Sequence, residues 1–164
     1  MNDSANAWIG LGANLGEPRT QLEAALAAID ALDDTRVVLK SSFYQTPPMG
    51  GAEQPDYLNA VAGIRTMLTP EALLEGLLSI ETRLGRRRDG QLWGPRVIDL
   101  DLLCYGDQRR DTAFLRLPHP GMAKRAFVLK PLAEVAPDLD IPGQGRVASL
   151  CRAVDDDGIV KMEE

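Results

Sequence analysis

Histidine and cysteine are scarce in this chain, and both shortages limit the kinds of metal site it can build. The single histidine, His119, excludes a histidine-built metal centre. The two cysteines, Cys104 and Cys151, are far apart in sequence and fit neither a zinc site nor a disulfide framework. Any metal ion is therefore expected to be held by carboxylates.

Long apolar runs and net positive charge are also missing. No segment approaches the ~18 uninterrupted apolar residues of a membrane span, and the N-terminus does not pair a basic region with an apolar run. We therefore expect a cytoplasmic protein without membrane contact. The net charge of −6 argues against general nucleic-acid binding. The length of 164 residues suits one domain, 1–164, and this compactness favours a monomer.

The most informative local feature is an arginine-rich segment that ends in two aspartates, GRRRDGQLWGPRVIDLD at 85–101. Glycines and Pro95 predict a loop in its first part, and 97–105 are predicted to form a strand. In a strand, Asp99 and Asp101 share one face, with Cβ atoms about 7 Å apart, and could hold hard cations between them. The opposite face is predicted to be apolar, with Ile98, Leu100, Leu102 and Cys104.

Each part of this segment has a simpler interpretation when taken alone. Asp-x-Asp occurs often on solvated strand edges, and a run of arginines is by default a solvated patch. However, Val97 and Leu103 share the face of the aspartates, so the carboxylates interrupt an apolar row and need a partner. Planar guanidinium groups also suit phosphate oxygens, and Arg96 stands close to the acidic pair. The combination predicts a site that moves phosphate.

Alternating strand and helix patterns predict an α+β fold of the ferredoxin-like type. The order is β-α-β-β-α-β, an antiparallel sheet with helices packed on one face, plus a C-terminal extension. The strands are expected at 8–11, 37–44, 57–66 and 97–105, and the helices at 18–32 and 69–84.

Two other parts of the chain are less regular. A further helix is expected near 131–135, and the tail at 140–164 has no assigned role. Gly10, Gly12 and Gly16 miss the spacing of a dinucleotide-binding loop and instead predict a tight turn after the first strand.

Several motifs resemble the 6-hydroxymethyl-7,8-dihydropterin pyrophosphokinase family, from the start of the chain to about residue 139. The matching stretches are GLGANLG, SSFYQTPPMG, QPDYLNAV, IETRLGRRR, WGPRVIDLDLL and LPHPGMAKRAFVLKPLAEVAPDL. Together they are highly specific. The resemblance implies an enzyme of folate biosynthesis that uses two Mg²⁺ ions. Such enzymes transfer the β,γ-pyrophosphoryl unit of ATP to the hydroxymethyl group of the pterin and release AMP.

The resemblance also implies roles for individual residues. Asp99 and Asp101 match metal ligands, and Arg86 and Arg96 match arginines that hold the transferring group, with Arg86 supplied when its loop closes. The positions that match the ATP side are Glu81, Arg88, Trp93, Arg96, His119 and Arg125. The positions that match the pterin side are Thr46, Pro47, Met49, Tyr57, Asn59, Trp93 and Phe127.

Three residues depart from the pattern of the family. Leu78 stands where some relatives have Gln, Asp89 where some have Lys, and Phe114 where some have Arg. Arg87 or Arg116 could compensate, and the departures concern nucleotide affinity and loop behaviour more than the reaction. Two other classes stay open: a DxD nucleotide-sugar transferase, which would release a nucleoside diphosphate, and a non-catalytic ferredoxin-like binding module.

Overall fold

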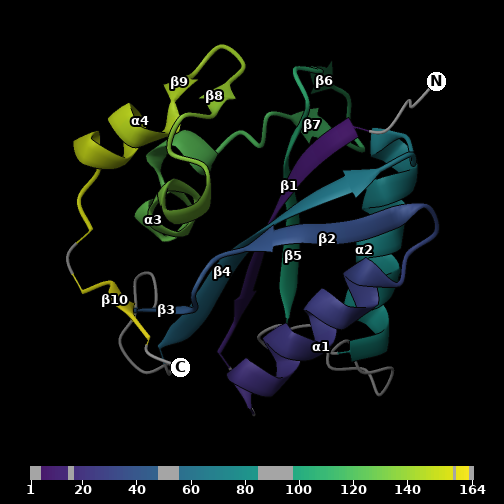
Figure 1. Cartoon of the computed structure of the whole chain (residues 1–164), viewed down its shortest axis with the longest axis horizontal. Helices are drawn as coiled ribbons and strands as arrows, with labels where there is room; N and C mark the ends of the chain where they lie inside the picture. The colour runs from purple at the N-terminus through teal and green to yellow at the C-terminus, as the bar shows by residue number, and fades with distance from the viewer. Residues whose placement is uncertain (1–4, 15–16, 48–55, 85–97, 157, 163–164) are drawn as a thin grey trace.

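The computed structural model describes residues 5–14, 17–47, 56–84, 98–156 and 158–162, and its centre is an antiparallel sheet (Figure 1). The strand order is β10-β3-β4-β1-β5, and β2 also pairs with β4. The six strands are β1 (Ala5–Ala13), β2 (Thr35–Lys40), β3 (Tyr44–Thr46), β4 (Tyr57–Thr66), β5 (Asp99–Tyr105) and β10 (Val160–Lys161). The predicted ferredoxin-like order of strands and helices is confirmed, but the single strand expected at 37–44 is divided into β2 and β3, which both pair with β4.

Two helices, α1 (Pro18–Asp30) and α2 (Pro70–Leu84), pack on one face of this sheet. Thr69 caps α2, since its side-chain oxygen accepts a hydrogen bond of 3.1 Å from the backbone N–H of Ala72. The apolar faces of α1 and α2 pack against the strands in the larger core. This core includes Ile9, Leu11, Leu22, Ile29, Leu73, Leu77, Ile80 and Leu102. None of the helices within the described ranges is long and apolar enough to cross a membrane.

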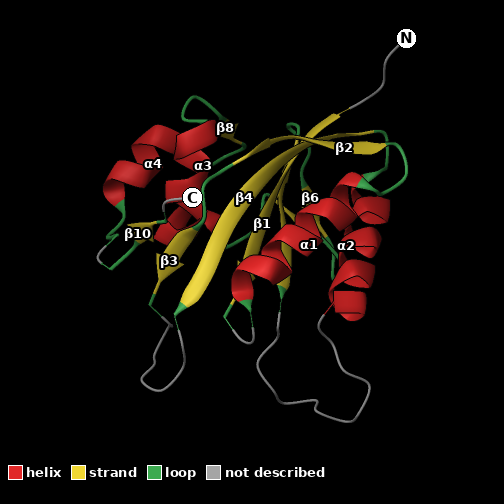
Figure 2. Ribbon diagram, turned by 60° about the horizontal axis from the view of Figure 1, so that its bottom comes forward, coloured by secondary structure: helices red, strands yellow, loops and turns green. Residues whose placement is uncertain are grey.

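The chain after β5 first forms the hairpin of β6 (Arg110–Asp111) and β7 (Arg116–Leu117), and Leu117 joins the larger core. The elements that follow form a second layer on the opposite face of the sheet (Figure 2). They are the short 3-10 helix η1 (Met122–Lys124), α3 (Ala126–Val135), β8 (Asp140–Ile141), β9 (Gly145–Arg146) and α4 (Val147–Ala153). The helix α3 begins at Ala126, five residues before the predicted start, and carries Pro131 in its interior. Phe127 therefore lies in the first turn of a helix that packs on the sheet.

The glycines near the N-terminus lie in a strand, which corrects the predicted turn. β1 continues to Ala13, so Gly10 and Gly12 are strand residues. A Cβ atom at Gly12 would lie 2.7 Å from Oδ1 of Asn59 on the neighbouring strand. The sheet therefore requires glycine at Gly12 because a side chain of β4 already occupies the space above it.

The apolar alternation predicted for β5 also fails at its second half. The register between β1 and β5 shifts next to Trp8, which pairs with Cys104, and Leu103 is skipped. Leu103 and Cys104 consequently both join the core on the α3 side, where Sγ of Cys104 lies 3.7 Å from Sδ of Met122. Burial raises the pKa of the Cys104 thiol to about 12, so this cysteine stays protonated and unreactive.

Glu134 connects α3 to the segment that leads into β3. Its Oε1 accepts hydrogen bonds from the Ser42 backbone N–H at 3.0 Å and from the Tyr44 hydroxyl at 2.8 Å. Its Oε2 accepts a bond of 2.8 Å from the Ser42 hydroxyl and lies 3.7 Å from Nζ of Lys161 in β10. Burial alone would raise the pKa of Glu134, but these bonds and the lysine hold it below its usual value.

Replacing Glu134 with Gln is expected to lower the free energy of unfolding by about 2 kcal/mol at neutral pH, because the donors around it lose a charged acceptor. A carboxyl whose folded-state pKa is depressed stabilises the fold above its unfolded value of 4.5, and this contribution disappears as pH falls through the folded-state pKa. Urea unfolding should therefore give the full difference in the free energy of unfolding between wild type and variant at pH 7, and this difference should shrink as the pH falls below 4.5.

The exposed Glu75 of α2 offers a matched control for this experiment. Glu75→Gln should leave the free energy of unfolding unchanged at both pH values. A Glu134→Gln difference that stays constant across this pH range would contradict the assigned role of the carboxylate.

Candidate functional site

The layer formed by α3 leaves a cavity of about 380 Å³ between this helix and the sheet. Such a volume is sufficient for a small heterocyclic ligand. The cavity is lined by Gly10, Leu11, Gly12, Thr46, Pro47, Tyr57, Asn59, Ala60, Val61, Asp99, Asp101, Arg125, Phe127 and Val128. Residues from three strands, from the end of β3 and from the start of α3 thus meet in one place.

The register of the sheet aligns the polar residues of this cavity across β1. Gly12 pairs with Asn59 on one side and with Asp99 on the other. Gly10 pairs with Asp101 in the same way. Because neighbouring strands are about 4.8 Å apart, Asn59 and Asp99 stand about 10 Å from each other across a glycine floor. The amide of Asn59 therefore lies on one side of the β1 backbone at Gly10 and Gly12, and the two carboxylates of Asp99 and Asp101 lie on the other.

The amide of Asn59 is held in place by a neighbour from β3. Its Nδ2 donates a hydrogen bond of 2.8 Å to Oγ1 of Thr46. Only 7% of Asn59 and 4% of Thr46 are exposed. A buried amide with one fixed bond keeps further donor and acceptor capacity for a planar ligand that offers both.

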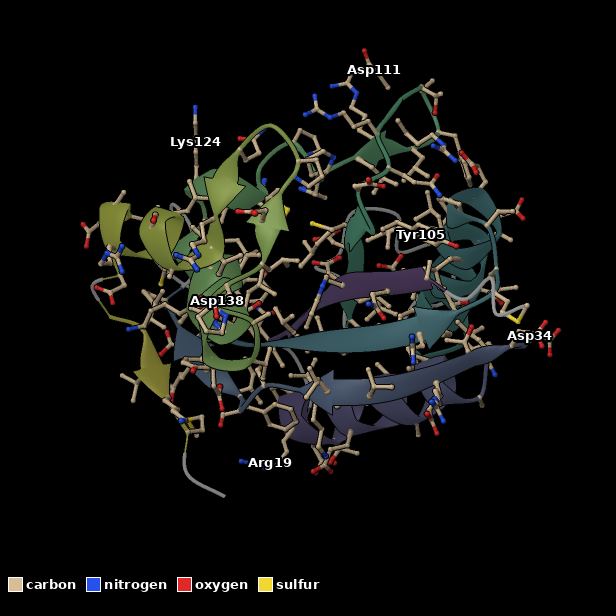
Figure 3. The ribbon with its side chains drawn as sticks, turned by 45° about the horizontal axis from the view of Figure 1, so that its top comes forward. Arg19, Asp34, Tyr105, Asp111, Lys124 and Asp138 are labelled. Carbon is tan, nitrogen blue, oxygen red and sulfur yellow. The ribbon has the colours of Figure 1, made fainter. Side chains whose placement is uncertain are left out.

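A second cavity, of about 390 Å³, lies beside β5 between α2 and the β6–β7 hairpin. Leu78 and Phe114, two of the departures from the family pattern, both line it, and they are 38% and 48% exposed. Arg116 lines the same cavity. Among the described residues, the wall thus combines apolar surface with the permanent positive charge of Arg116. Figure 3 shows that Asp111, on the same hairpin, projects away from the body of the protein.

Asp101 lines both cavities, and His119 lines the second. Nε2 of His119 lies 3.9 Å from Oδ1 of Asp101, and Nδ1 accepts a bond of 3.2 Å from the Gly121 backbone N–H. The pKa of His119 is lowered, mainly by burial. The Asp101 carboxylate acts to raise this pKa, and the positive charge of Arg125 lowers it further. The imidazole is therefore neutral at pH 7 with its proton on Nε2, where it can act as a donor.

Glu81 holds the start of β5 against α2. It is only 4% exposed, and its Oε2 accepts a hydrogen bond of 2.7 Å from the backbone N–H of Leu100, between the two aspartates. At the other end of the same strand, the Tyr105 hydroxyl donates to the Leu68 carbonyl just before α2 (Figure 3). The strand that carries Asp99 and Asp101 is thus bonded to α2 near its start and to the residues that lead into α2 at its end.

The structure brings most of the described site residues into these two cavities. Thr46, Pro47, Tyr57, Asn59 and Phe127, all expected on the pterin side, line the first cavity. Arg125, which was expected on the ATP side, also lines the first cavity, because it directly precedes α3. The expected site residues that lie outside the described ranges are Met49, Arg86, Arg88, Trp93 and Arg96.

Carboxylate chemistry at this site fits magnesium. No group of three or more His, Cys, Asp or Glu side chains suited to a metal ion occurs among the described residues. Mg²⁺ is usually bound through one or two carboxylates together with substrate phosphates and water. A pair such as Asp99 and Asp101, on one face of a strand and beside two cavities, supplies the oxygen ligands of that kind of site.

Sequence reasoning missed the role of the two glycines, Gly10 and Gly12, as the floor of the first cavity. Two glycines at i and i+2 of a strand would have been the signal, since both lie on the same face. It placed Ala60 and Val61 in a strand but gave them no role in the site, since both are apolar and carry no local sign of one.

A family model and several proteins match this chain. The model of 7,8-dihydro-6-hydroxymethylpterin-pyrophosphokinase matches residues 8–137. A Pseudomonas aeruginosa protein named 2-amino-4-hydroxy-6-hydroxymethyldihydropteridine pyrophosphokinase is 45% identical over 155 residues, covering 94% of this chain and 95% of the relative. A Methylorubrum extorquens protein of the same name is 46% identical over 157 residues, covering 96% and 98%.

Solved structures show the same fold. The wild-type HPPK-DHPS of Plasmodium falciparum with STZ-DHP superposes with a TM-score of 0.69 at 14% sequence identity. The match covers 93% of this chain and 42% of the Plasmodium chain, so this chain spans less than half of that protein.

Proposed function

Because the chain belongs to the 7,8-dihydro-6-hydroxymethylpterin-pyrophosphokinase family, it transfers pyrophosphate from ATP to hydroxymethyldihydropterin in folate biosynthesis. We propose that each of its two cavities binds one of these two substrates. The pterin occupies the first cavity and ATP the second. The observation that carries this assignment is the position of Asp101, which lines both cavities. The reacting groups of two substrates would meet at that residue.

Pterin recognition in the first cavity would use the Asn59 amide and the ring of Phe127. A pterin carries alternating donors and acceptors on one edge, and the buried amide can complement them. The Phe127 ring and the half-buried Tyr57 offer aromatic faces for the bicyclic ring. With its edge at Asn59, a flat pterin would extend over Gly12 towards Asp99, which is about 10 Å away. This orientation directs the hydroxymethyl group at the carboxylates.

ATP in the second cavity would place its base or ribose against the apolar wall formed by Leu78 and Phe114. Its phosphates would then extend towards Asp101, past the Nε2 proton of His119 and the guanidinium of Arg116. Both groups are donors and suit phosphate oxygens. The apolar wall explains how the departures at Leu78 and Phe114 could be tolerated, since an adenine ring is bound by contact with flat apolar surface as well as by charge.

The transfer itself is a displacement at the β-phosphorus of ATP. The hydroxymethyl oxygen forms a bond to this phosphorus and loses its proton, and the bond to the oxygen bridging the α- and β-phosphates breaks, so AMP leaves with that oxygen. Asp99 and Asp101 would hold two Mg²⁺ ions, which offset phosphate charge when bound. Arg125 lies at the first cavity beside the aspartates and would add a fixed positive charge.

Several further parts of the proposal rest on the sequence alone. Arg86 and Arg96 are proposed to hold the transferring group, Arg88 and Trp93 to contact ATP, and Trp93 and Met49 to complete the pterin site. The remaining proposals are that the chain is one domain, is monomeric and is located in the cytoplasm.

Manganese binding tests the metal assignment without requiring turnover. With a non-hydrolysable ATP analogue, electron paramagnetic resonance should count two Mn²⁺ ions bound per wild-type chain, and Asp101→Asn should lose at least one of them, because a ligand oxygen with its charge is removed. Asp107→Asn, an exposed aspartate in the turn after β5, is the matched control and should retain both. Equal manganese binding by all three proteins would refute the proposal that Asp101 is a ligand.

A further inference from the structure

The C-terminal segment, defined here as Asp156 with residues 158–162, touches both walls of the first cavity. On one side, β10 pairs with β3, with Val160 opposite Gln45 and Lys161 opposite Tyr44. The Met162 backbone N–H extends this pairing by donating a bond of 2.8 Å to the Phe43 carbonyl. The strand β3 is therefore paired along both edges, with β4 on the other.

The same segment is attached to α3, which forms the opposite wall. Oδ2 of Asp156 lies 2.8 Å from Nζ of Lys130, and Nζ of Lys161 lies 3.7 Å from Oε2 of Glu134. Both partners belong to α3, the helix that begins beside Phe127. One short stretch of chain thus joins the helix that carries Phe127 to the strand that carries Thr46.

Gly158 makes the most direct contact between this segment and the cavity wall. A Cβ atom at Gly158 would lie 3.1 Å from Cγ and 3.3 Å from Cδ of Pro47, which itself lines the first cavity. The backbone of Gly158 has φ of +83°, a conformation that glycine adopts without strain. The backbone of Gly158 therefore lies so close to Pro47 that a Cβ atom there would force one of the two to shift by a few tenths of an ångström.

From these contacts we propose that the C-terminal segment is a positioning element of the pterin site, which sets the separation between Phe127 on α3 and Thr46 and Pro47 at the end of β3. This inference rests on the proposed function, because it takes the first cavity as the pterin site. Pairing on both edges holds β3 in register, and the ion pairs hold α3 against it. The segment does not line the first cavity, so it acts through Pro47 and β3.

Gly158→Ala is the sharpest test of this role. Its new methyl group must displace Pro47 or the segment itself, so KM for the pterin should rise about tenfold, while kcat and KM for ATP change less than twofold. Gly106→Ala is the matched control. Gly106 also has a positive φ, of +54°, but a Cβ atom there would meet nothing within 4 Å. It should show similar backbone strain and an unchanged KM for the pterin.

Met162→Pro provides a second variant that adds no bulk near Pro47. Proline lacks the N–H that bonds to Phe43, so the pairing of β10 with β3 weakens and KM for the pterin should rise about fivefold. If Gly158→Ala does not fold, this variant decides the question. A pterin KM equal to that of the wild type, or an equal rise in KM for both substrates, would overturn the inference.

Calorimetry separates this inference from the proposed function. The pterin is titrated into each full-length protein that has been saturated with a non-hydrolysable ATP analogue, so no turnover is needed. Weaker pterin binding by Gly158→Ala than by Gly106→Ala supports the positioning role. Equal binding contradicts it. Failure of the wild type to form AMP would instead contradict the proposed function, and the measured pterin affinities would still decide the role of the segment.

Discussion

Asp99→Asn is expected to lower kcat for AMP formation by about a thousandfold, equivalent to roughly 4 kcal/mol of transition-state stabilisation. Asparagine keeps the size of the side chain but removes the negative charge. Asp99 lies directly opposite Gly12 in the register of the sheet, across the glycine floor from Asn59. The substitution should therefore lower kcat, because the negative charge of the transferring phosphates is less well offset. It should change the affinity for the pterin much less.

Steady-state kinetics with both substrates varied, and urea unfolding of the same proteins, would check this result. Asp107→Asn is the matched control, since Asp107 is exposed and lines neither cavity. The Asp99 variant should still unfold in a single cooperative urea transition, so that the loss of kcat is not caused by loss of the folded state. A variant that keeps more than a tenth of wild-type kcat would contradict the role assigned to Asp99.

Asn59→Leu is expected to lower kcat/KM for the pterin about a hundredfold, because two hydrogen bonds of about 1.4 kcal/mol each are lost while the branching of the side chain is kept. The same substitution breaks the bond of Asn59 to Thr46, which leaves that hydroxyl without this donor. KM for ATP should stay within twofold of the wild type, since Asn59 does not line the second cavity.

A matched control for this substitution exists on the neighbouring strand. Asn6 is exposed on β1, opposite Arg65 and at the far end of the sheet from Asn59. Asn6→Leu should leave both KM values unchanged. A result in which Asn59→Leu raises KM for ATP and not KM for the pterin would reverse the assignment of substrates to the two cavities.

Patterns with a local physical cause predicted much of the fold. Thr69 and Pro70 mark the start of α2 because capping depends only on adjacent residues. The period of two along β5 places Asp99 and Asp101 on one face, and both line the first cavity. The alternation fails at Leu103, where the register with β1 shifts, because a bulge depends on the partner strand and not on the sequence around it.

Features created by distant contacts could not be predicted in this way. Gly12 looks like a turn residue until Asn59, on another strand, is placed above it. The strand β10 has only two residues, and its pairing partner lies more than a hundred positions earlier in the chain, so no local pattern indicates it. Arg125 was expected on the ATP side, and its position at the first cavity follows from the earlier start of α3.

The most direct test of the account follows the β-phosphate of ATP. The protein is incubated with Mg²⁺, the hydroxymethyldihydropterin and ATP that carries a radioactive β-phosphate, and the labelled products are separated. We predict that the label moves to the pterin, with one AMP formed for each pterin consumed and no AMP without the pterin. Label that stays in ADP would mean transfer of a single phosphoryl group, and this result would contradict pyrophosphoryl transfer.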